Sequence, residues 1–552
     1  MTAEAEGLEI DARDGFKALA RADWEGARGA LLSALEAGDE SPEVLDALGR
    51  ALWWLRDAEG AVVQRERAYA GFRRAGELAR AARIALWLSR EYGLVWRNEA
   101  AANGWLARAE RLLADVAPGA EAGWLDLARS EQASLPGRAA DLAAQALAVA
   151  VQTRDADLEL RALAQLGLAE VSLGKVDEGL ARLDEAMAAA TGGEPTTLET
   201  FADVCCTLML ACERAGDDKR PKEWSQVFES FVRKYDHVPL LAFCRTCGAD
   251  VSAANGRIDA AEQQLLAALR ELREAGQRAR CVHPAARLAE IRVLQGRFDE
   301  AEQLLAGFED EPDAIRAAVA LRLARGEGEA AAAILEQRLA DVVRTTLLAV
   351  PLLGQLVQAR LAASDLDAAR AAADELAAIA AASGRERVQA VAALARGRVL
   401  AAAGDPEAKA TLRQAVKLLA QQRLPLDAAR ARLELARALA VSAPEVAIDA
   451  AAKARRQLET LGADRDADAA AALLRTLGAK GRSGPRRHDV LSKRETEVLR
   501  LIGEGLSNAK IAERLFISPK TAEHHVGRIY AKLDLRSRGE AAAYAARNLG
   551  GE

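Results

Sequence analysis

The sequence predicts an all-α protein in two unequal parts, a long region of stacked helical pairs followed by a small four-helix domain. The 552 residues include only 14 prolines and 4% aromatic residues, a composition that favours helix throughout. Small residues recur at a regular spacing through residues 1–477. Residues 489–552 contain four short segments that each begin at a helix-capping residue. These three observations define the fold class and its division.

The clearest repeat lies around Gly167, which Gly179 follows after twelve positions and Ala186 after seven more. The same layout returns at Gly49, Ala61 and Ala68, at Gly248, Ala260 and Ala267, and at Ala289 and Ala301, with weaker copies after Gly326 and Leu361. The spacing resembles that of tetratricopeptide repeats, which implies a tetratricopeptide-like α-solenoid with a concave groove. The intervals between copies are irregular, so the repeat boundaries stay open, and a non-repeating helical domain is the alternative.

Charge is divided unevenly between the two parts. Residues 479–552 hold 15 Lys and Arg against 9 Asp and Glu, a formal charge of +6, which leaves −13 for the rest of the chain. A basic module joined to an acidic body is typical of a DNA-binding module attached to one with another role. The segment 478–488 is rich in Gly and basic residues and lacks apolar periodicity, so we expect a flexible basic linker there.

Tryptophan and cysteine are the residues of the repeat region with a possible functional meaning. All eight tryptophans precede residue 225. We expect core fillers between repeats, although such rings also line ligand grooves. Cys244 and Cys247, with Cys281 and His283, have the residue types of a zinc site, but their apolar surroundings favour buried free cysteines. We therefore predict neither a metal nor another cofactor.

The sequence of residues 489–552 marks where each of four helices begins. The start signals are the capping-box pairs Ser492/Glu495 and Ser537/Glu540, the N-cap Ser507, and Ser518 followed by Pro519. Only Phe516 and Ile517 separate the second helix from the cap of the third. Such a tight corner predicts a helix-turn-helix, whose second member enters the major groove of DNA.

The predicted third helix, roughly residues 519–533, has an apolar and a polar face. The apolar residues Ala522, Val526, Ile529 and Leu533 recur at helical spacing and should pack on the domain. On the polar face, His524 and Arg528 are predicted to read bases, while Lys520, Thr521 and Lys532 contact phosphates. An ordinary amphipathic surface helix is the alternative. The full predicted DNA-contacting set is Lys510, Ser518, Lys520, Thr521, Glu523, His524, Arg528, Lys532 and Arg538.

Residues 491–549 resemble the DNA-binding domain of LuxR/GerE-type bacterial transcription regulators. The matching motifs include Arg494-Glu495, Gly505-Leu506-Ser507-Asn508, Ile511-Ala512, Ile517-Ser518, His525-Val526, Lys532-Leu533 and Glu540-Ala541. The resemblance implies a third helix in the major groove and a homodimer on DNA, paired through the fourth helix. The implied dimer contacts are Ala541, Ala542, Tyr544 and Ala545. The chain departs from the family at Glu523, where lysine is common, so the family's base preference does not carry over.

No motif of an enzyme or a membrane protein is found. Gly174-Lys175-Val176 lacks the pattern of a phosphate-binding loop, and no run of about 18 apolar residues exists. Without a signal-peptide pattern or a disulfide framework, a cytoplasmic location is expected. We therefore predict a non-enzymatic transcription regulator that binds double-stranded DNA and senses a protein, peptide or small-molecule effector through its repeats. The alternatives are an interaction scaffold with a secondary DNA-binding role and a nucleotide hydrolase with a degenerate phosphate loop.

Overall fold

The computed structural model of the protein describes residues 12–117, 119–217, 219–235, 238–309, 311–479, 491, 493–533, 535 and 537–549. Every regular element in these ranges is a helix, as the sequence predicts. None of the described helices has the combination of length and apolar character that crossing a membrane requires. The linker predicted at 478–488 falls outside these ranges after Ala479, and so does the capping residue Ser492.

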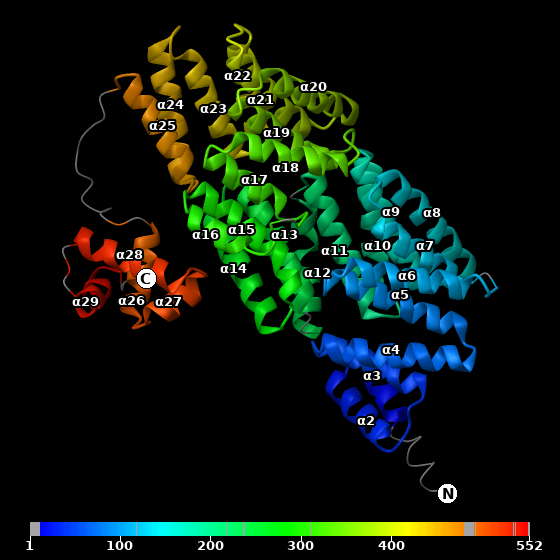
Figure 1. The fold of residues 1–552 in the computed structure, drawn as a ribbon. Helices are drawn as coiled ribbons and strands as arrows, with labels where there is room; N and C mark the ends of the chain where they lie inside the picture. Colours follow the sequence, from blue (N-terminus) through cyan, green and yellow to red (C-terminus); the bar gives the residue numbers. More distant parts are fainter. Residues whose placement is uncertain are drawn as a thin grey trace, which may run out of the picture.

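A row of helices fills the chain from α2 to α25, after a helical stretch at 12–20 (Figure 1). The bounds are α2 Trp24–Glu36, α3 Pro42–Trp54, α4 Ala58–Ala75, α5 Leu78–Leu94, α6 Glu99–Leu113, α7 Ala120–Gln132, α8 Pro136–Thr153, α9 Ala156–Ser172, α10 Val176–Gly192, α11 Leu198–Ala215, α12 Arg220–Tyr235, α13 Val238–Ala254, α14 Ile258–Glu274, η1 Arg278–Cys281, α15 Val282–Leu294, α16 Phe298–Leu305, α17 Ile315–Ala324, α18 Gly328–Ala340, η2 Leu347–Ala349, α19 Val350–Ala362, α20 Leu366–Ser383, α21 Glu386–Ala402, α22 Ala408–Gln421, α23 Pro425–Leu439, α24 Pro444–Thr460 and α25 Asp464–Thr476.

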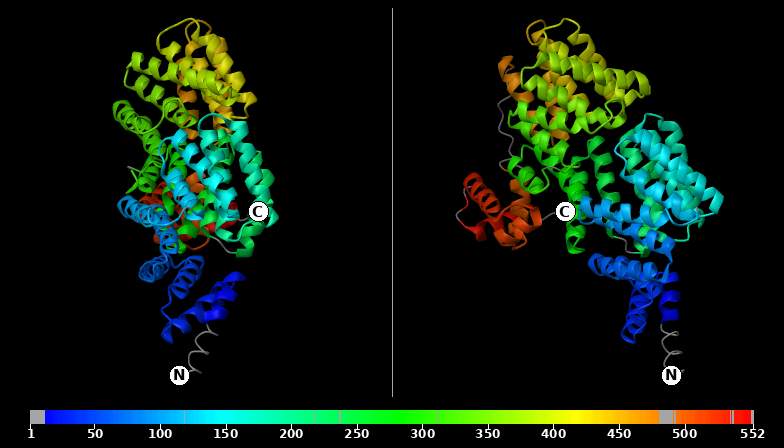
Figure 2. Two further views of the ribbon diagram at one scale, coloured as in Figure 1. Left: turned by 90° about the vertical axis from the view of Figure 1, so that its right-hand side faces the viewer. Right: turned by 45° about the vertical axis from the view of Figure 1, so that its right-hand side comes forward.

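Two kinds of contact organise this row into a solenoid. Consecutive helices pack against each other as pairs, and from α5 to α25 each odd-numbered helix also touches the next odd-numbered one. The odd-numbered helices from α5 to α25 therefore form one continuous layer. Figures 1 and 2 show the curved stack of helices that results. Such a superhelix surrounds a concave inner surface, which the repeat spacing predicts.

The small residues of the repeat pattern are needed where paired helices cross. A Cβ atom on Gly167 of α9 would lie 2.6 Å from the backbone oxygen of Gly179 on α10, and the reverse distance is 2.4 Å. A Cβ atom on Gly49 would lie 3.1 Å from the backbone oxygen of Ala61. These crossings confirm the tetratricopeptide-like interpretation. Gly248 is less crowded, since an added Cβ would approach no closer than 3.7 Å to Gln264.

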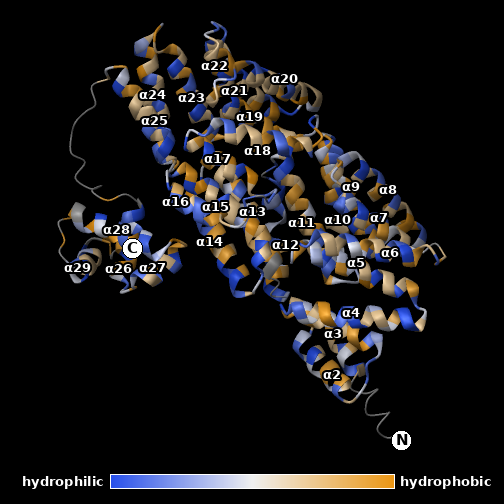
Figure 3. Ribbon diagram, in the orientation of Figure 1, coloured by the Kyte–Doolittle hydropathy of each residue, from blue (hydrophilic) through white to orange (hydrophobic). Residues whose placement is uncertain are grey.

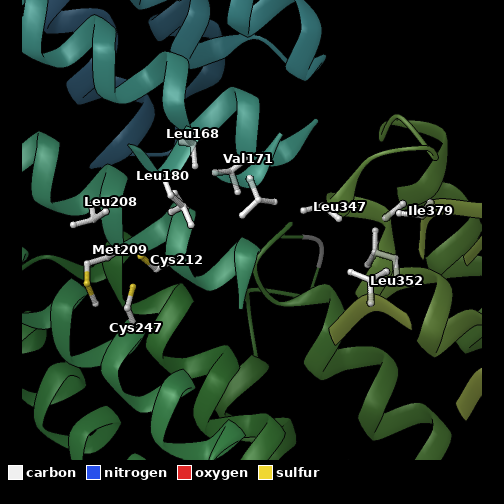
Figure 4. Packing of buried hydrophobic residues seen from close by; sticks show 14 of the residues in the cluster. Leu168, Val171, Leu180, Leu208, Met209, Cys212, Cys247, Leu347, Leu352 and Ile379 are labelled. Carbon is white, nitrogen blue, oxygen red and sulfur yellow. The ribbon is translucent and has the colours of Figure 1, made fainter. Parts of the chain in front are cut away.

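The solenoid turns far enough for segments distant in sequence to meet. The short helix η2 contacts α9 and α11, and Leu347 of η2 shares one hydrophobic core with Leu168 and Val171 of α9 (Figure 4). Apolar and polar residues alternate along the helices, as amphipathic packing requires (Figure 3). Ion pairs also bridge the turn, with Arg97 2.7 Å from Glu311. These contacts bring distant segments together around the concave inner surface, which we call the lumen.

Tryptophan takes both of the roles that the sequence leaves open. Trp54 is a core residue, whose Nε1 donates to Glu199 at 3.1 Å and whose ring stacks on that of Trp24. Trp53, Trp87 and Trp124 border the lumen, and Trp124 is at the same time buried in a hydrophobic core. The cysteines of the described ranges are free thiols. Burial raises the pKa of Cys244 to about 12, so this thiol is protonated at neutral pH.

Candidate nucleic-acid interface

Four helices form the C-terminal domain, with the starts that the sequence predicts. They are α26 (Lys493–Gly503), α27 (Asn508–Leu515), α28 (Pro519–Leu533) and α29 (Arg538–Asn548). Side-chain caps open three of them. The Ser507 side chain accepts from the Lys510 N–H, that of Ser518 from the Thr521 N–H at 3.1 Å, and that of Ser537 from the Glu540 N–H. Each hydroxyl satisfies a backbone donor that a helix start leaves open.

The corner between α27 and α28 is set by Phe516. This residue ends α27 in the left-handed conformation, with φ 55°, which for a residue other than glycine costs about 1–2 kcal/mol. The Ile517 N–H then bonds back to the Ala512 carbonyl at 2.9 Å. Arg494 of α26 holds the same corner, because its Nη2 donates to the Leu515 carbonyl at 3.0 Å. The predicted helix-turn-helix is thus formed, and the hydrogen bonds of Ile517 and Arg494 stabilise its strained turn.

The two predicted faces of α28 are separated as expected. Ala522, Val526 and Ile529 are buried in the domain core, and Leu533 packs at its edge. Lys520, Glu523, His524 and Arg528 are exposed on the opposite side, and so is Lys510 on α27. Gly527 lies on the exposed side too and places no side chain between its neighbours. The side chain of Lys532 lies outside the described part of the structure.

Three predicted contact residues are engaged inside the domain. The hydroxyls of Ser518 and Thr521 lie 2.8 Å apart, and both residues are half-buried at the start of α28. Arg538 donates to Asn508 Oδ1 at 2.7 Å and also to the Leu506 carbonyl. Arg538 therefore links α29 to the loop before α27, and this structural role is one that its sequence position did not reveal.

The fourth helix corrects part of the predicted dimer surface. Ala541 and Ala545 are buried in the core of their own domain, and Ala545 lies against Gly503 of α26. A buried alanine cannot meet a second copy, so these two residues do not belong to a dimer contact. Ala542 and Tyr544 are half-buried at the edge of that core.

The C-terminal domain docks on the solenoid, and no local pattern in the sequence predicts this contact. In Figure 1 the domain lies beside α14 and α16. Arg494 Nη2 lies 3.1 Å from Glu300 Oε2 of α16, and both side chains are buried. The Ser518 N–H donates to Gln303 Oε1 at 3.1 Å, and the Arg273 guanidinium of α14 lies 4.5 Å from the ring centroid of Phe516.

Charge is concentrated at the centre of this contact. Burial alone would raise the pKa of Glu300, but the hydrogen bond from Arg297 and the charges of Arg494, Arg297 and Arg292 lower it overall. Glu300 is therefore ionised among three guanidinium groups. Burial, and next to it the charge of Arg494, lowers the pKa of His525 on α28, whose Nδ1 is buried without a hydrogen-bond partner. His525 is therefore neutral at physiological pH.

The C-terminal domain has a tight corner between two helices, and the second of these helices exposes a polar, mixed-charge face. These two features define the class of helix-turn-helix DNA-binding domains. Within that class, the family "Bacterial regulatory proteins, luxR family" matches residues 489–545, and the C-terminal domain belongs to it.

Two bacterial regulatory proteins are similar in sequence to this C-terminal domain. The transcriptional regulatory protein LiaR of Bacillus subtilis is 51% identical over 61 residues, which are 11% of this chain and 29% of LiaR. The oxygen regulatory protein NreC of Staphylococcus haemolyticus is 54% identical over 56 residues, 10% of this chain and 26% of NreC. The chain thus spans less than a third of the length of these relatives.

Solved structures similar over the longer part of the chain are helical proteins of low identity. One is the hetero-tetramer Cut9–Hcn1 of the APC/C, with a TM-score of 0.36 and 14% identity over 86% of this chain and 98% of that one. Another is yeast Tom70, with a TM-score of 0.26 and 14% identity over 86% of this chain and 97% of that one.

Proposed function

We propose that the protein is a DNA-binding transcription regulator. The observation that carries the proposal is the exposed polar face of α28 in a LuxR-family domain. In a major groove this face presents His524 and Arg528 to base edges, with Lys520 at the end that meets phosphates. The relatives that match over this domain are named as regulatory proteins, which supports the same role.

Selection of binding sites from genomic DNA with the full chain, followed by binding measurements on variants, tests this proposal. Arg528→Ala should cost about 1–3 kcal/mol and relax selectivity at one base position. Lys520→Ala should weaken all sequences equally and lower the salt slope by about one unit. Arg500→Ala, an exposed arginine on α26, is the matched control. Unchanged affinity and selectivity in Arg528→Ala would contradict the assignment.

We also propose that the solenoid restrains DNA binding until an effector binds it. The docked arrangement engages the Ser518 N–H, a helix-start donor of the kind that contacts phosphate in DNA complexes. An effector that favours the released arrangement therefore increases DNA binding by population shift.

Pairing of two copies on DNA is the remaining part of the proposal. A two-fold dimer would place two α28 helices in half-sites about one DNA turn apart. With Ala541 and Ala545 buried, Ala542 and Tyr544 are the predicted residues left for this contact.

A further inference from the structure

The N-terminal half of the lumen contains a cavity of about 890 Å³. This volume falls in the range of about 300–1,000 Å³ that pockets for small organic ligands occupy. Trp53 of α3, Trp87 of α5 and Trp124 of α7 lie along its wall, and guanidinium groups lie over two of these rings, Arg65 over Trp87 at 4.1 Å and Arg83 over Trp124 at 3.6 Å. A wall of this kind suits a planar aromatic molecule better than a flexible chain.

Most charged groups of the wall neutralise each other. Arg161 of α9 donates to Glu131 at 2.7 Å and lies 3.3 Å from Asp203, which also pairs with Arg90. Arg65 pairs with Asp46 at 2.8 Å. These arginines are held in place and their charge is balanced within the protein.

Arg83 of α5 also lies on the wall but, unlike these arginines, it forms no ion pair among the described residues. Its guanidinium lies 3.6 Å from the ring centroid of Trp124, and within the described ranges it has neither a hydrogen bond nor an ion pair. Burial lowers the pKa of Arg83 to about 10, and the group therefore still carries its charge at neutral pH. Trp124 is itself fixed, since its Nε1 donates to Asp155 at 2.7 Å. The charges of Asp155, Glu121 and Asp157 favour the charged form of Arg83, but none of these carboxylates forms an ion pair with it among the described residues. An anion in the cavity would supply such a direct partner.

Two further guanidinium groups on the wall share this condition. Arg50 of α3 and Arg280 of η1 have no side-chain partner among the described residues, and the Nε of Arg280 is fully buried. One carboxylate, Glu91 of α5, is also buried without a partner. It lies eight residues from Arg83, about 12 Å along the helix, too far to pair with it.

The other half of the lumen differs in this respect. A second cavity of about 1,210 Å³ there is also lined by arginines, and several of these pair with carboxylates. Arg430 lies 2.6 Å from Asp466, Arg287 lies 3.0 Å from Asp250, and Arg398 lies 4.0 Å from Glu434. Arginines that have no ion pair among the described residues and lie beside tryptophan are therefore a feature of the N-terminal cavity.

We propose that this cavity binds a small planar aromatic anion, whose carboxylate, sulfonate or phosphate pairs with Arg83 while its ring system lies against the tryptophans. Arg83 and Trp124 form the centre of the site, and Arg50 and Arg280 add positive charge around it. The site supplies a chemical class for the effector in the proposed function. Ligand binding at this site is measured without DNA, so a negative result would leave the DNA-binding proposal untouched.

Two fluorescent probes with the same aromatic body test the site on the full chain. Anilinonaphthalene sulfonate carries the anion, and N-phenylnaphthylamine lacks it. We expect the sulfonate to bind the wild-type protein at least about tenfold more tightly than the amine, because a charge-assisted hydrogen bond is lost with the anion. Equal affinities for the two probes would overturn the proposal whatever the variants show.

Substitutions then locate the probe. Arg83→Gln should weaken the sulfonate about tenfold or more and leave the amine unchanged, while Arg83→Lys, which keeps the charge, should retain part of the affinity. The matched control is Arg398→Gln, a buried arginine of the other cavity, which should bind both probes as the wild type does. Melting curves and near-ultraviolet circular dichroism identify a variant that is not folded, and Arg50→Gln then takes its place. Wild-type affinity for the sulfonate in folded Arg83→Gln would refute the site.

Discussion

Replacing Gln303 by leucine should strengthen DNA binding by releasing the DNA-binding domain. Gln303 is exposed on α16, and its Oε1 accepts the bond of 3.1 Å from the Ser518 N–H. Leucine keeps the size of the side chain but cannot accept a hydrogen bond. Such a bond contributes about 0.5–1.5 kcal/mol net, so the ratio of docked to released protein should fall about two- to tenfold.

Arg273→Ala acts on the same contact from α14. The stacking of its guanidinium on Phe516 is worth about 0.5–1 kcal/mol at an exposed position, or about two- to fivefold. If the two contacts act independently, the double variant shifts the ratio by about four- to fiftyfold. Because only the released form binds DNA in this scheme, the apparent Kd should fall by the same factor wherever docking predominates.

Fluorescence anisotropy of the full chain on a selected DNA site measures this effect. Gln263→Leu, an exposed glutamine of α14, is the control for the chemistry of the substitution. Hydrogen exchange in peptides covering residues 516–519 gives an independent readout, since the released Ser518 amide should exchange faster. A double variant with wild-type affinity and wild-type exchange would refute the docking mechanism.

Three further predictions address packing, pairing and pH. Gly179→Ala would place a Cβ 2.4 Å from a backbone oxygen and should cost about 1–3 kcal/mol, seen as faster amide exchange in α9 and α10. Gly104→Ala on α6, where an added Cβ meets nothing within 4 Å, should instead stabilise its helix by up to about 1 kcal/mol, and effects of equal sign would contradict the crossing geometry. Ala542→Glu should weaken binding to a two-fold DNA site far more than to a half-site, whereas the exposed Ala543→Glu should not; equal losses on both sites would exclude pairing through α29. The folded-state pKa of His525 is lowered from 6.5, so the unfolded state binds the proton first as pH falls. Stability of the domain should then decline below about pH 6.5 and decline less in His525→Gln, and melting curves of equal pH dependence would rule this out.

The helix-turn-helix domain is predictable from sequence because its signals are local. Each cap and its helix start lie three residues apart, as in Ser518 and Thr521, and the apolar face of α28 repeats within one helix. The repeat pairs are predictable for the same reason, since Gly167 and Gly179 are separated by one short turn. A local rule links each of these residues to its structure.

The same local rules misjudged α29. A stripe of alanines beside Tyr544 predicts an exposed surface that needs a second copy, but Ala541 and Ala545 are covered by α26 of their own domain. Arg538, a predicted DNA contact, also bonds to Leu506 and Asn508, a link that its sequence position does not reveal. Amphipathic spacing shows that a face is covered, and only the packing shows what covers it.

The sequence by itself determined the fold class, the four C-terminal helices and the exposed face that meets DNA in the proposed function. The tertiary structure alone decided that Arg494 meets Glu300, 194 residues earlier in the chain, and that Arg83 lies over Trp124 on the wall of the lumen. Such contacts between segments far apart in the sequence depend on how strongly the solenoid curves. The curvature is the sum of many small rotations between helix pairs, and no local pattern of residues encodes that sum.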